Sequence, residues 1–587
     1  MKLPTLALLA LACMLPTRFA DAQATSRASV SSAGTEGNGH SFRVTVSSSG
    51  RYVLFHSAAS NLVANDVNGA EDAFVHDRLT GTTTLVSVAT GGAQGNANSR
   101  GPVMSADERV VAFHSLSDNL SPNDTNAADD VFVHELATGV TTRVSVSSTG
   151  EGSALLARGP SISGDGRFVG FTSLSANLVP GDLNSVDDVF VHDSATATTV
   201  RASEALGGGA GDRDSYFASL SGDGRYLAFA SVATDLVPGD TNVQQDIFVR
   251  DLVAGTTERV SVATGGGEGH GFSFYPAISA DGGHVAFHSL AADLVASDAN
   301  AAGDVFVRDR IAATTVIASL ADDGAQGNGT AFACAISAHG RHVAFDSVAT
   351  NLVAGDTNGV DDLFVRDLLS GRTERVAVAS DGTQGDLDSR IPALSANGRI
   401  VAFGSGATTL VAGDANGLLD VFVRDRGELQ ATATCFGDAT AACPCANAGA
   451  PGRGCENSAG TGGALLTTTG DHAPDTLVLT VWGELPGALS VFLQGDLVHA
   501  PAAFGDGLLC AGGTLLRLYV RNAQAGSASA PGPGDPSITA RSAALGDPIA
   551  PGSTRWYQVH YRDPDPGFCP APQGATWNAS HALGMLW

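Results

Sequence analysis

The chain has 587 residues and a formal net charge of −28 at pH 7, because 60 acidic residues outnumber 32 basic ones. This charge excludes nucleic acid as an expected partner, since its phosphate backbone would be repelled. Lys2 is the only lysine, so Schiff-base and phosphate-loop lysine chemistry is excluded from the rest of the chain.

The N-terminus has the features of a secretory signal peptide. Lys2 is followed by an apolar run at residues 3–16 and then by "ADAQA", a small-residue stretch typical of a cleavage point. We predict a signal peptide over residues 1–22 and an exported mature chain that is secreted, periplasmic or at the cell surface. A lipoprotein signal ending at Cys13 is the alternative, although it leaves a very short apolar region. No run is long and apolar enough to cross a bilayer, so we expect no transmembrane segment.

From residue 27 onward the sequence repeats itself every 58 residues. The string Asp-x-Phe-Val begins at Asp72 and recurs at every step of 58 up to Asp420. Each repeat holds four runs rich in β-formers and bounded by turn residues; in the third copy they begin at residues 160, 167, 188 and 198. Four strands in each of seven units predict an all-β fold with a seven-bladed β-propeller over residues 23–434. An open β-solenoid is the rival, but 58 residues is long for one coil.

A strand at the N-terminus is predicted to close the ring. The string "RASV" (27–30) lies one period before "LVSV" (85–88), which stands where a fourth strand belongs. We expect residues 27–30 to pair with the third strand of the last blade, 420–425. This pairing would cover sheet edges that otherwise attract other chains.

The long connections of each repeat carry a string of oxygen-bearing side chains. In an up-and-down blade, the connection from the second to the third strand and the connection to the next blade lie on one face, here called the loop face; tight turns occupy the opposite turn face. Long loops on a rigid scaffold commonly bind ligands. The candidate site residues are Asp66, Asn68, Asp72, Asp124, Asn126, Asp130, Asp182, Asn184, Asp188, Asp240, Asn242, Asp246, Asp298, Asn300, Asp304, Asp356, Asn358, Asp362, Asp414, Asn416 and Asp420.

Two interpretations of these residues stay open. Asp and Asn side chains fix turns by bonding to nearby backbone groups. They are also calcium ligands, which makes calcium the one candidate cofactor. An EF-hand is excluded in the sixth repeat, because Val360 stands at the fifth loop position and Asp367 ends a strand about 16 Å from Asp362.

The repeat resembles the WD40-like (PD40) propeller repeat of TolB-type proteins. The matching stretches are "ISGDGRFVGFTS" (162–173), "DVFVHD" (188–193) and "TTVRASE" (198–204), and the likeness covers about residues 27–434. The resemblance implies a propeller and a docking surface, without a particular function. The Asp-x-Asn string and a Gly-rich stretch are insertions relative to the family repeat.

The C-terminal region, 435–587, differs from the repeats in composition. Strand-like runs at 475–483, 489–495, 515–522 and 555–563 predict a β-sandwich-like domain pinned by disulfides. It carries the cysteines Cys435, Cys443, Cys445, Cys455, Cys510 and Cys569, enough for three disulfides. The stretches "CPCANAGAPGRGCENS" and "FGDGLLCAGG" resemble a C-terminal module of exported bacterial proteins, which implies no activity.

No catalytic motif stands out: we find no Gly-x-Ser-x-Gly elbow, His-Glu-x-x-His string or phosphate loop. Seven near-identical repeats favour binding or scaffolding, because the residues of an active site are needed only once. We therefore expect an exported, monomeric, non-catalytic propeller that recognises a protein or glycan through its acidic loop face, with calcium as a candidate aid. The alternatives are an extracellular enzyme that cleaves polysaccharides or peptides, and a structural cell-surface protein.

Overall fold

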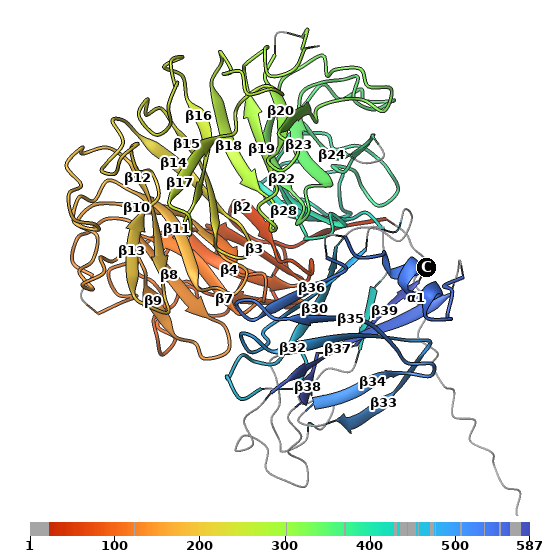
Figure 1. Ribbon diagram of the computed structural model, residues 1–587. Helices are drawn as coiled ribbons and strands as arrows, with labels where there is room; N and C mark the ends of the chain where they lie inside the picture. The colour runs from red at the N-terminus through yellow and green to blue at the C-terminus, as the bar shows by residue number, and fades with distance from the viewer. Residues whose placement is uncertain are drawn as a thin grey trace, which may run out of the picture.

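The computed structural model describes residues 23–427 except 123, 297, 301, 369 and 370, and in the C-terminal region residues 431–434, 443, 453–563 and 577–586 with short gaps. The predicted signal peptide, 1–22, lies outside the described residues. Figure 1 shows the blades following one another round a ring from red to teal, with the C-terminal strands, in blue, gathered beside it.

Seven four-stranded antiparallel sheets form the ring, which confirms the predicted seven-bladed propeller. Six of them are built from consecutive strands. These are β2 (Ser41–Val46), β3 (Tyr52–Ser57), β4 (Asp72–Asp77) and β5 (Thr82–Leu85); β6 (Ser99–Met104), β7 (Val110–Ser115), β8 (Asp130–Glu135) and β9 (Thr141–Arg143); β10 (Ala157–Ile162), β11 (Phe168–Ser173), β12 (Asp188–Asp193) and β13 (Thr198–Arg201); β14 (Ser215–Leu220), β15 (Tyr226–Ser231), β16 (Asp246–Asp251) and β17 (Thr256–Arg259); β18 (Ser273–Ile278), β19 (His284–Ser289), β20 (Asp304–Asp309) and β21 (Thr314–Ile317); and β22 (Ala331–Ile336), β23 (His342–Ser347), β24 (Asp362–Asp367) and β25 (Arg372–Arg375).

The seventh blade closes the ring with the N-terminal strand. It contains β26 (Ser389–Leu394), β27 (Ile400–Ser405), β28 (Asp420–Asp425) and β1 (Ala24–Arg27), and Arg27 lies opposite Phe422. The closure was predicted, but β1 lies three residues earlier than the expected 27–30. The reason is that the chain leaves the sheet after its bond from Ala28 N–H to Val421 O, and Val30 already pairs with Glu36 in the loop.

Phenylalanines from the second and third strands build the core between blades. Phe55 and Phe74, for example, stack with ring centroids 5.8 Å apart, and both are fully buried. They pack with Val421 and Val423 of the seventh blade. The same Phe pair recurs in every blade, so each blade is held mainly by burial of apolar surface against its neighbour.

The first strands surround the propeller axis, since those of neighbouring blades contact one another all the way round. On the turn face, the turns that follow them form a closed belt of hydrogen bonds. The belt bonds are Asp107 N to Gly164 O, Gly164 N to Gly222 O, Gly222 N to Ala280 O, Asp281 N to Ala338 O, Ala338 N to Ala396 O, Ala396 N to Ser48 O, and Ser48 Oγ to Ala106 O. The turn side of the axis is therefore bounded by backbone.

The C-terminal part forms a six-stranded, a three-stranded and a two-stranded sheet. Its elements are β29 (Ala431–Thr434), β30 (Leu465–Thr469), β31 (Val478–Trp482), β32 (Leu489–Gly495), β33 (Leu497–Phe504), β34 (Gly507–Gly512), β35 (Leu516–Asn522), β36 (Ser527–Ala530), α1 (Ile538–Ala544), β37 (Thr554–Arg562), β38 (Trp577–Ala579) and β39 (Ala582–Leu586). Leu479 of the three-stranded sheet shares a core with Phe492 and Tyr557 of the six-stranded sheet, as expected for a sandwich. Residues 431–434 pair with β39 and not with the propeller.

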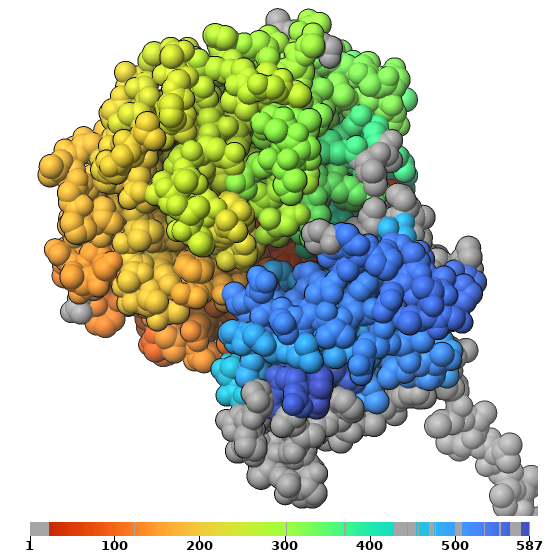
Figure 2. Space-filling view, in the orientation of Figure 1, coloured from red at the N-terminus to blue at the C-terminus, as the bar shows by residue number. Residues whose placement is uncertain are grey.

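The C-terminal part covers a portion of the turn face (Figure 2). The indole of Trp482 lies where a Cβ on Gly164 would be, 2.5 Å from its Cζ3. Arg109 donates to the carbonyl of Gly460 at 3.2 Å. Arg453 is 2% exposed, and burial lowers its pKa while Asp107 opposes the shift. None of the described residues forms a helix with the length and hydropathy of a membrane span.

The described cysteines follow the predicted division between bonded and free. Cys443 is bonded to Cys455, and Cys510 is also disulfide-bonded. Cys334 in the propeller is free, and burial raises the pKa of its thiol to about 12. The remaining predicted members, Cys435, Cys445 and Cys569, lie outside the described residues.

Thiol counting checks the disulfide prediction for all six C-terminal cysteines. Denatured, unreduced mature protein is expected to react with one equivalent of a thiol reagent, at Cys334. The protein reduced before denaturation is the control and should react at every cysteine. Seven reactive thiols in the unreduced sample would show that the C-terminal cysteines are not oxidised.

Candidate functional site

Each Asp-x-Asn string lies at the junction of two loops, where it forms what we call an acid cradle. In the first blade, Asn68 Nδ2 donates to the Asp72 carboxylate and to Gly95 O in the loop to the next blade, both at 2.8 Å. The same two bonds recur in all seven cradles at 2.7–3.1 Å. The structure thus brings the predicted residues of every repeat together, and the amide ties two loops to one carboxylate.

Five of the cradles contain an arginine, supplied by the last residue of the fourth strand. Its guanidinium lies 2.6–3.9 Å from both aspartates. These arginines are Arg27, Arg143, Arg201, Arg259 and Arg375.

The other two cradles use glutamine in place of arginine. The strand residue there is Leu85 or Ile317. In the first blade Gln94 Nε2 donates to Asp66 and Asp72 at 2.8 and 2.9 Å, and Gln326 does the same in the fifth. Every cradle therefore has a hydrogen-bond donor of its own facing the two carboxylates.

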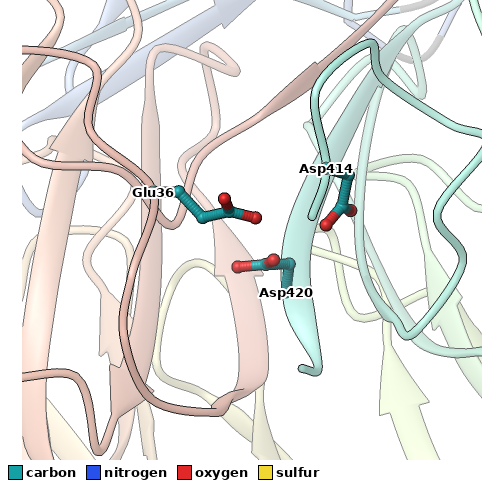
Figure 3. Close-up of side chains that lie close together, drawn as sticks. All are labelled: Glu36, Asp414 and Asp420. Atoms are coloured by element: carbon teal, nitrogen blue, oxygen red, sulfur yellow. The ribbon is translucent and has the colours of Figure 1, made fainter. Parts of the chain in front are cut away.

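A third carboxylate joins the cradles of the fourth and seventh blades. Glu36, Asp414 and Asp420 point toward one another across the ring closure (Figure 3), with ligand atoms within 4.8 Å. Arg27 Nη1 lies 3.3 Å from Asp414 and 3.2 Å from Asp420, and also bonds Glu36. Asp240, Asp246 and Glu268 surround Arg259 in the same way at 2.7–3.3 Å.

The donor atoms in these triads could serve calcium, but the guanidinium lies among them. Calcium needs its oxygens at 2.3–2.6 Å, so the arginine would have to leave first. The side chains of Asp414 and Asp240 are 4% and 2% exposed, and burial raises the pKa of both to about 6. The geometry fits an arginine counter-ion, and calcium binding stays a prediction.

Melting curves in millimolar calcium and in equal magnesium separate the two interpretations. If arginine and glutamine satisfy the cradles, both ions should shift the melting temperature equally, by screening the net charge of −28. A calcium site at one hundred times its Kd would add about 2.7 kcal/mol. Asp66→Asn and Asp298→Asn, in the cradles without arginine, are the most sensitive variants. A calcium-specific shift that shrinks in them would contradict the arginine and glutamine model.

A second group of side chains, which we call the axial ring, lies on the first strands where they meet the loop face. One repeat position of these strands has a positive φ in six blades. It holds Gly101 and Gly159 in the second and third blades and a large side chain in four others. The large side chains are Arg43 (φ 40°), Phe217 (61°), Tyr275 (52°) and Ile391 (57°).

These four residues occupy a backbone conformation that suits glycine. A left-handed conformation costs an L-residue roughly 1–2 kcal/mol, and a β-branched residue such as Ile391 is unusual there. Gly101 and Gly159 show that the fold can be built without the cost. Strained positions of this kind cluster at ligand sites, and the ring residues are exposed: Phe217 by 36%, Tyr275 by 43% and Ile391 by 45%.

Aromatic side chains of the fourth to sixth blades form one half of the axial ring. Phe217 contacts Tyr275 with centroids 4.8 Å apart. Phe274 packs between Tyr275 and His288, and His288 stacks on Phe332 at 5.1 Å. Phe332 is 41% exposed, so this aromatic wall presents ring faces and edges to solvent.

Arginines of the other blades form the polar half. Arg158 pairs with Asp187 at 3.0 Å while its side chain stays 50% exposed. Arg100 pairs with Glu71 and Arg390 with Asp361, with exposures of 40% and 57%. Each guanidinium is thus held in place by a carboxylate but keeps donors free toward solvent.

Sequence reasoning missed the axial ring. The predicted site residues stand at positions that all repeats share, whereas the ring lies at positions where the repeats differ. At the position of Arg43 the copies read Arg, Gly, Gly, Phe, Tyr, Ala and Ile. The preceding position varies as well, reading Phe, Arg, Arg, Tyr, Phe, Phe and Arg. Variation at these two adjacent positions, in an otherwise regular repeat, was the available signal. This variation breaks the symmetry of the seven repeats.

Asp346, behind the ring, gives a pH test of this region. It is 3% exposed, and burial, followed by the charge of Asp361, raises its pKa to about 7. The pKa of Asp346 in the folded protein exceeds the usual 3.8. Its protonated form therefore contributes its full stabilisation below pH 3.8, and this contribution is lost as the pH rises through 7. Asp346→Asn should therefore raise the melting temperature more at pH 8 than at pH 4.5. Exposed Asp381→Asn is the control; an equal gain at both pH values would contradict the assignment.

No protein-family model matches the sequence, and no curated protein matches it. Similar solved structures include TolB from Acinetobacter baumannii (16% identity, TM-score 0.32, 57% of this chain and 62% of that chain). Others are the propeller domain of the Trilobed protease from Pyrococcus furiosus (10%, 0.41, 66% and 95%) and an oligogalacturonate lyase in complex with manganese (12%, 0.43, 69% and 96%). TolB is thus among them, as the repeat resemblance predicted, and at these identities the likeness concerns the fold alone.

Proposed function

We propose that this protein is an exported, non-catalytic binding propeller that recognises its ligand at the axial ring. The observation that carries the proposal is the set of large side chains at Arg43, Phe217, Tyr275 and Ile391, in a conformation that glycine adopts without cost. A purely structural propeller gains nothing from this strain. The half-exposed aromatic wall supplies apolar contact area, and the arginines supply fixed donors.

The arrangement of the C-terminal part supports the loop face as the binding face. Trp482 and Arg453 lie against the turn face, and the belt of turns bounds that side of the axis. A ligand therefore reaches the ring from the loop face. The acid cradles, closed by their own arginines and glutamines, hold the loops around it, and calcium is not required in this proposal.

A triple variant, Phe217→Gly, Tyr275→Gly and Ile391→Gly, tests the site. It copies the residue found at Gly101 and Gly159, so the fold should keep or gain stability while ligand binding is lost. Purified wild-type and variant chains would be screened against glycans and envelope proteins. Ligands that bind both chains equally would place recognition elsewhere.

Export is a separate part of the proposal. It is supported by the signal-like N-terminus and by the disulfide between Cys443 and Cys455. N-terminal sequencing of the protein recovered outside the cytoplasm should begin at Gln23. A chain that keeps residues 1–22 would argue against cleavage at this point.

A polysaccharide-cleaving enzyme is the second candidate, and Asp346 is the observation in its favour. A buried carboxyl group beside Asp361 with a pKa of about 7 has the properties of a general acid. The same screen decides between the two, because a cleaved glycan product that disappears in Asp346→Asn would identify an enzyme.

A further inference from the structure

The polar half of the axial ring offers donors and acceptors side by side. In each of the pairs Arg100–Glu71, Arg158–Asp187 and Arg390–Asp361, a partly exposed guanidinium is fixed by a carboxylate. Such a pair can donate to one group and accept from the next. Tyr216 adds a hydroxyl held by Gln245.

Arg43 differs from these arginines. It is exposed and makes no hydrogen bond or ion pair with the described residues. Burial lowers the pKa of both His56 and His114, and the charge of Arg43 adds to both shifts, so Arg43 lies near these histidines of the first and second blades. In the neighbouring second blade a Cβ on Gly101 would lie 3.1 Å from His114, whereas in the third blade Gly159 has no atom within 4 Å of the place where a Cβ would be, which leaves room there.

The charge balance disfavours a strongly anionic ligand. Three of the four arginines are matched by carboxylates, and the whole chain carries −28. An acidic polymer would be repelled over a long range at low salt. Uncharged hydroxyl groups, which both donate and accept, match the arginine–carboxylate pairs better.

The aromatic wall complements the polar half. The faces of Phe217 and Tyr275 suit a flat apolar surface, such as the C–H face of a sugar ring. The wall is confined to the inner strands, whereas a stable protein interface covers about 800 Å² on each partner. On the turn face the belt of turns encircles the axis, and Trp482 packs on Gly164 of that belt, which favours a chain end that enters from the loop face over a chain passing through.

From this combination we infer that the axial ring binds the end of an uncharged oligosaccharide. A sugar ring packs on Tyr275 and Phe217, and its hydroxyls bond to Arg43 and to the Arg100 and Arg158 pairs. The inference rests on the proposed binding function and names its ligand class.

The test uses the full mature chain and three sets of probes. These are neutral oligosaccharides (glucans, mannans, xylans and N-acetylglucosamine oligomers), their uronic-acid counterparts, and a peptide library. We expect retention of at least one neutral oligosaccharide, with affinity reduced at least tenfold by Tyr275→Gly and by Arg43→Gly. Both variants carry the glycine that the second and third blades use, so their melting curves should match or exceed that of the wild type.

The outcomes separate this inference from the proposed function. Binding of only uronic acids or only peptides, lost in the same variants, would overturn the ligand class and keep the axial ring as the site. Neutral oligosaccharides that bind both variants with wild-type affinity would overturn both. Absence of binding by every probe would also count against both.

Discussion

Deleting residues 23–32 is expected to destabilise the propeller strongly, because it opens the seventh blade. The deletion removes β1 and exposes the edge of β28, which is free to pair with another chain. It also removes Arg27, the cation between Asp414 and Asp420, and leaves those carboxylates buried without it. Melting curves should shift to lower temperature, and light scattering should show association.

A matched pair of double variants separates ring opening from the loss of cradle contacts. Arg27→Ala with Ser29→Ala breaks the bonds of the closing strand to Asp420. Arg143→Ala with Ser145→Ala breaks the equivalent bonds to Asp130 within a continuous blade. The two double variants should melt alike and stay monomeric, while the deletion associates. A monomeric deletion with an unchanged melt would disprove closure by β1.

Asp130→Ala is expected to be the most damaging single substitution in the cradles. Asp130 is fully buried and accepts bonds from Ser145 and Ser153, while Arg143 Nη2 lies 2.6 Å away. Removing one partner of a buried ion pair costs about 3–5 kcal/mol, because the other charge stays buried. Denaturant unfolding measures this loss.

Asp72→Ala in the first blade is the control for this prediction. Its cradle holds Gln94 and no arginine, so the substitution leaves unsatisfied neutral donors and no buried charge. Each such donor costs about 1–3 kcal/mol, and the loss should be smaller than for Asp130→Ala. Equal losses of stability in the two variants would show that a buried arginine does not make the loss of its aspartate more costly.

The chain also supplies a rescue experiment. Arg143→Leu alone should destabilise the second blade, because it leaves Asp124 and Asp130 without their cation. Adding Gly152→Gln recreates the Leu85 and Gln94 arrangement of the first blade. The double variant should recover most of the lost stability, since the glutamine then meets both aspartates.

The sequence by itself determined the propeller, its seven units and its closure. The reason is that a constant period of 58 residues aligns equivalent positions of all repeats. Strand signals such as "DVFVHD" are also local, so they can be recognised in the sequence itself. The fully buried Phe pairs of each blade follow from the same periodicity. The exact register of β1 did not, because it depends on where the loop after Ala28 leaves the sheet.

Only the tertiary structure decided what fills the cradles and where a ligand can bind. Arg143 and Ser153 belong to different parts of a repeat, and only the folded blade brings both to Asp130. Tyr275 and Arg43 are 232 positions apart in the numbering, yet both lie on first strands that surround one axis. A closed ring brings equivalent positions of all repeats to the same axis, so residues that look like scattered exceptions in sequence become neighbours around one site.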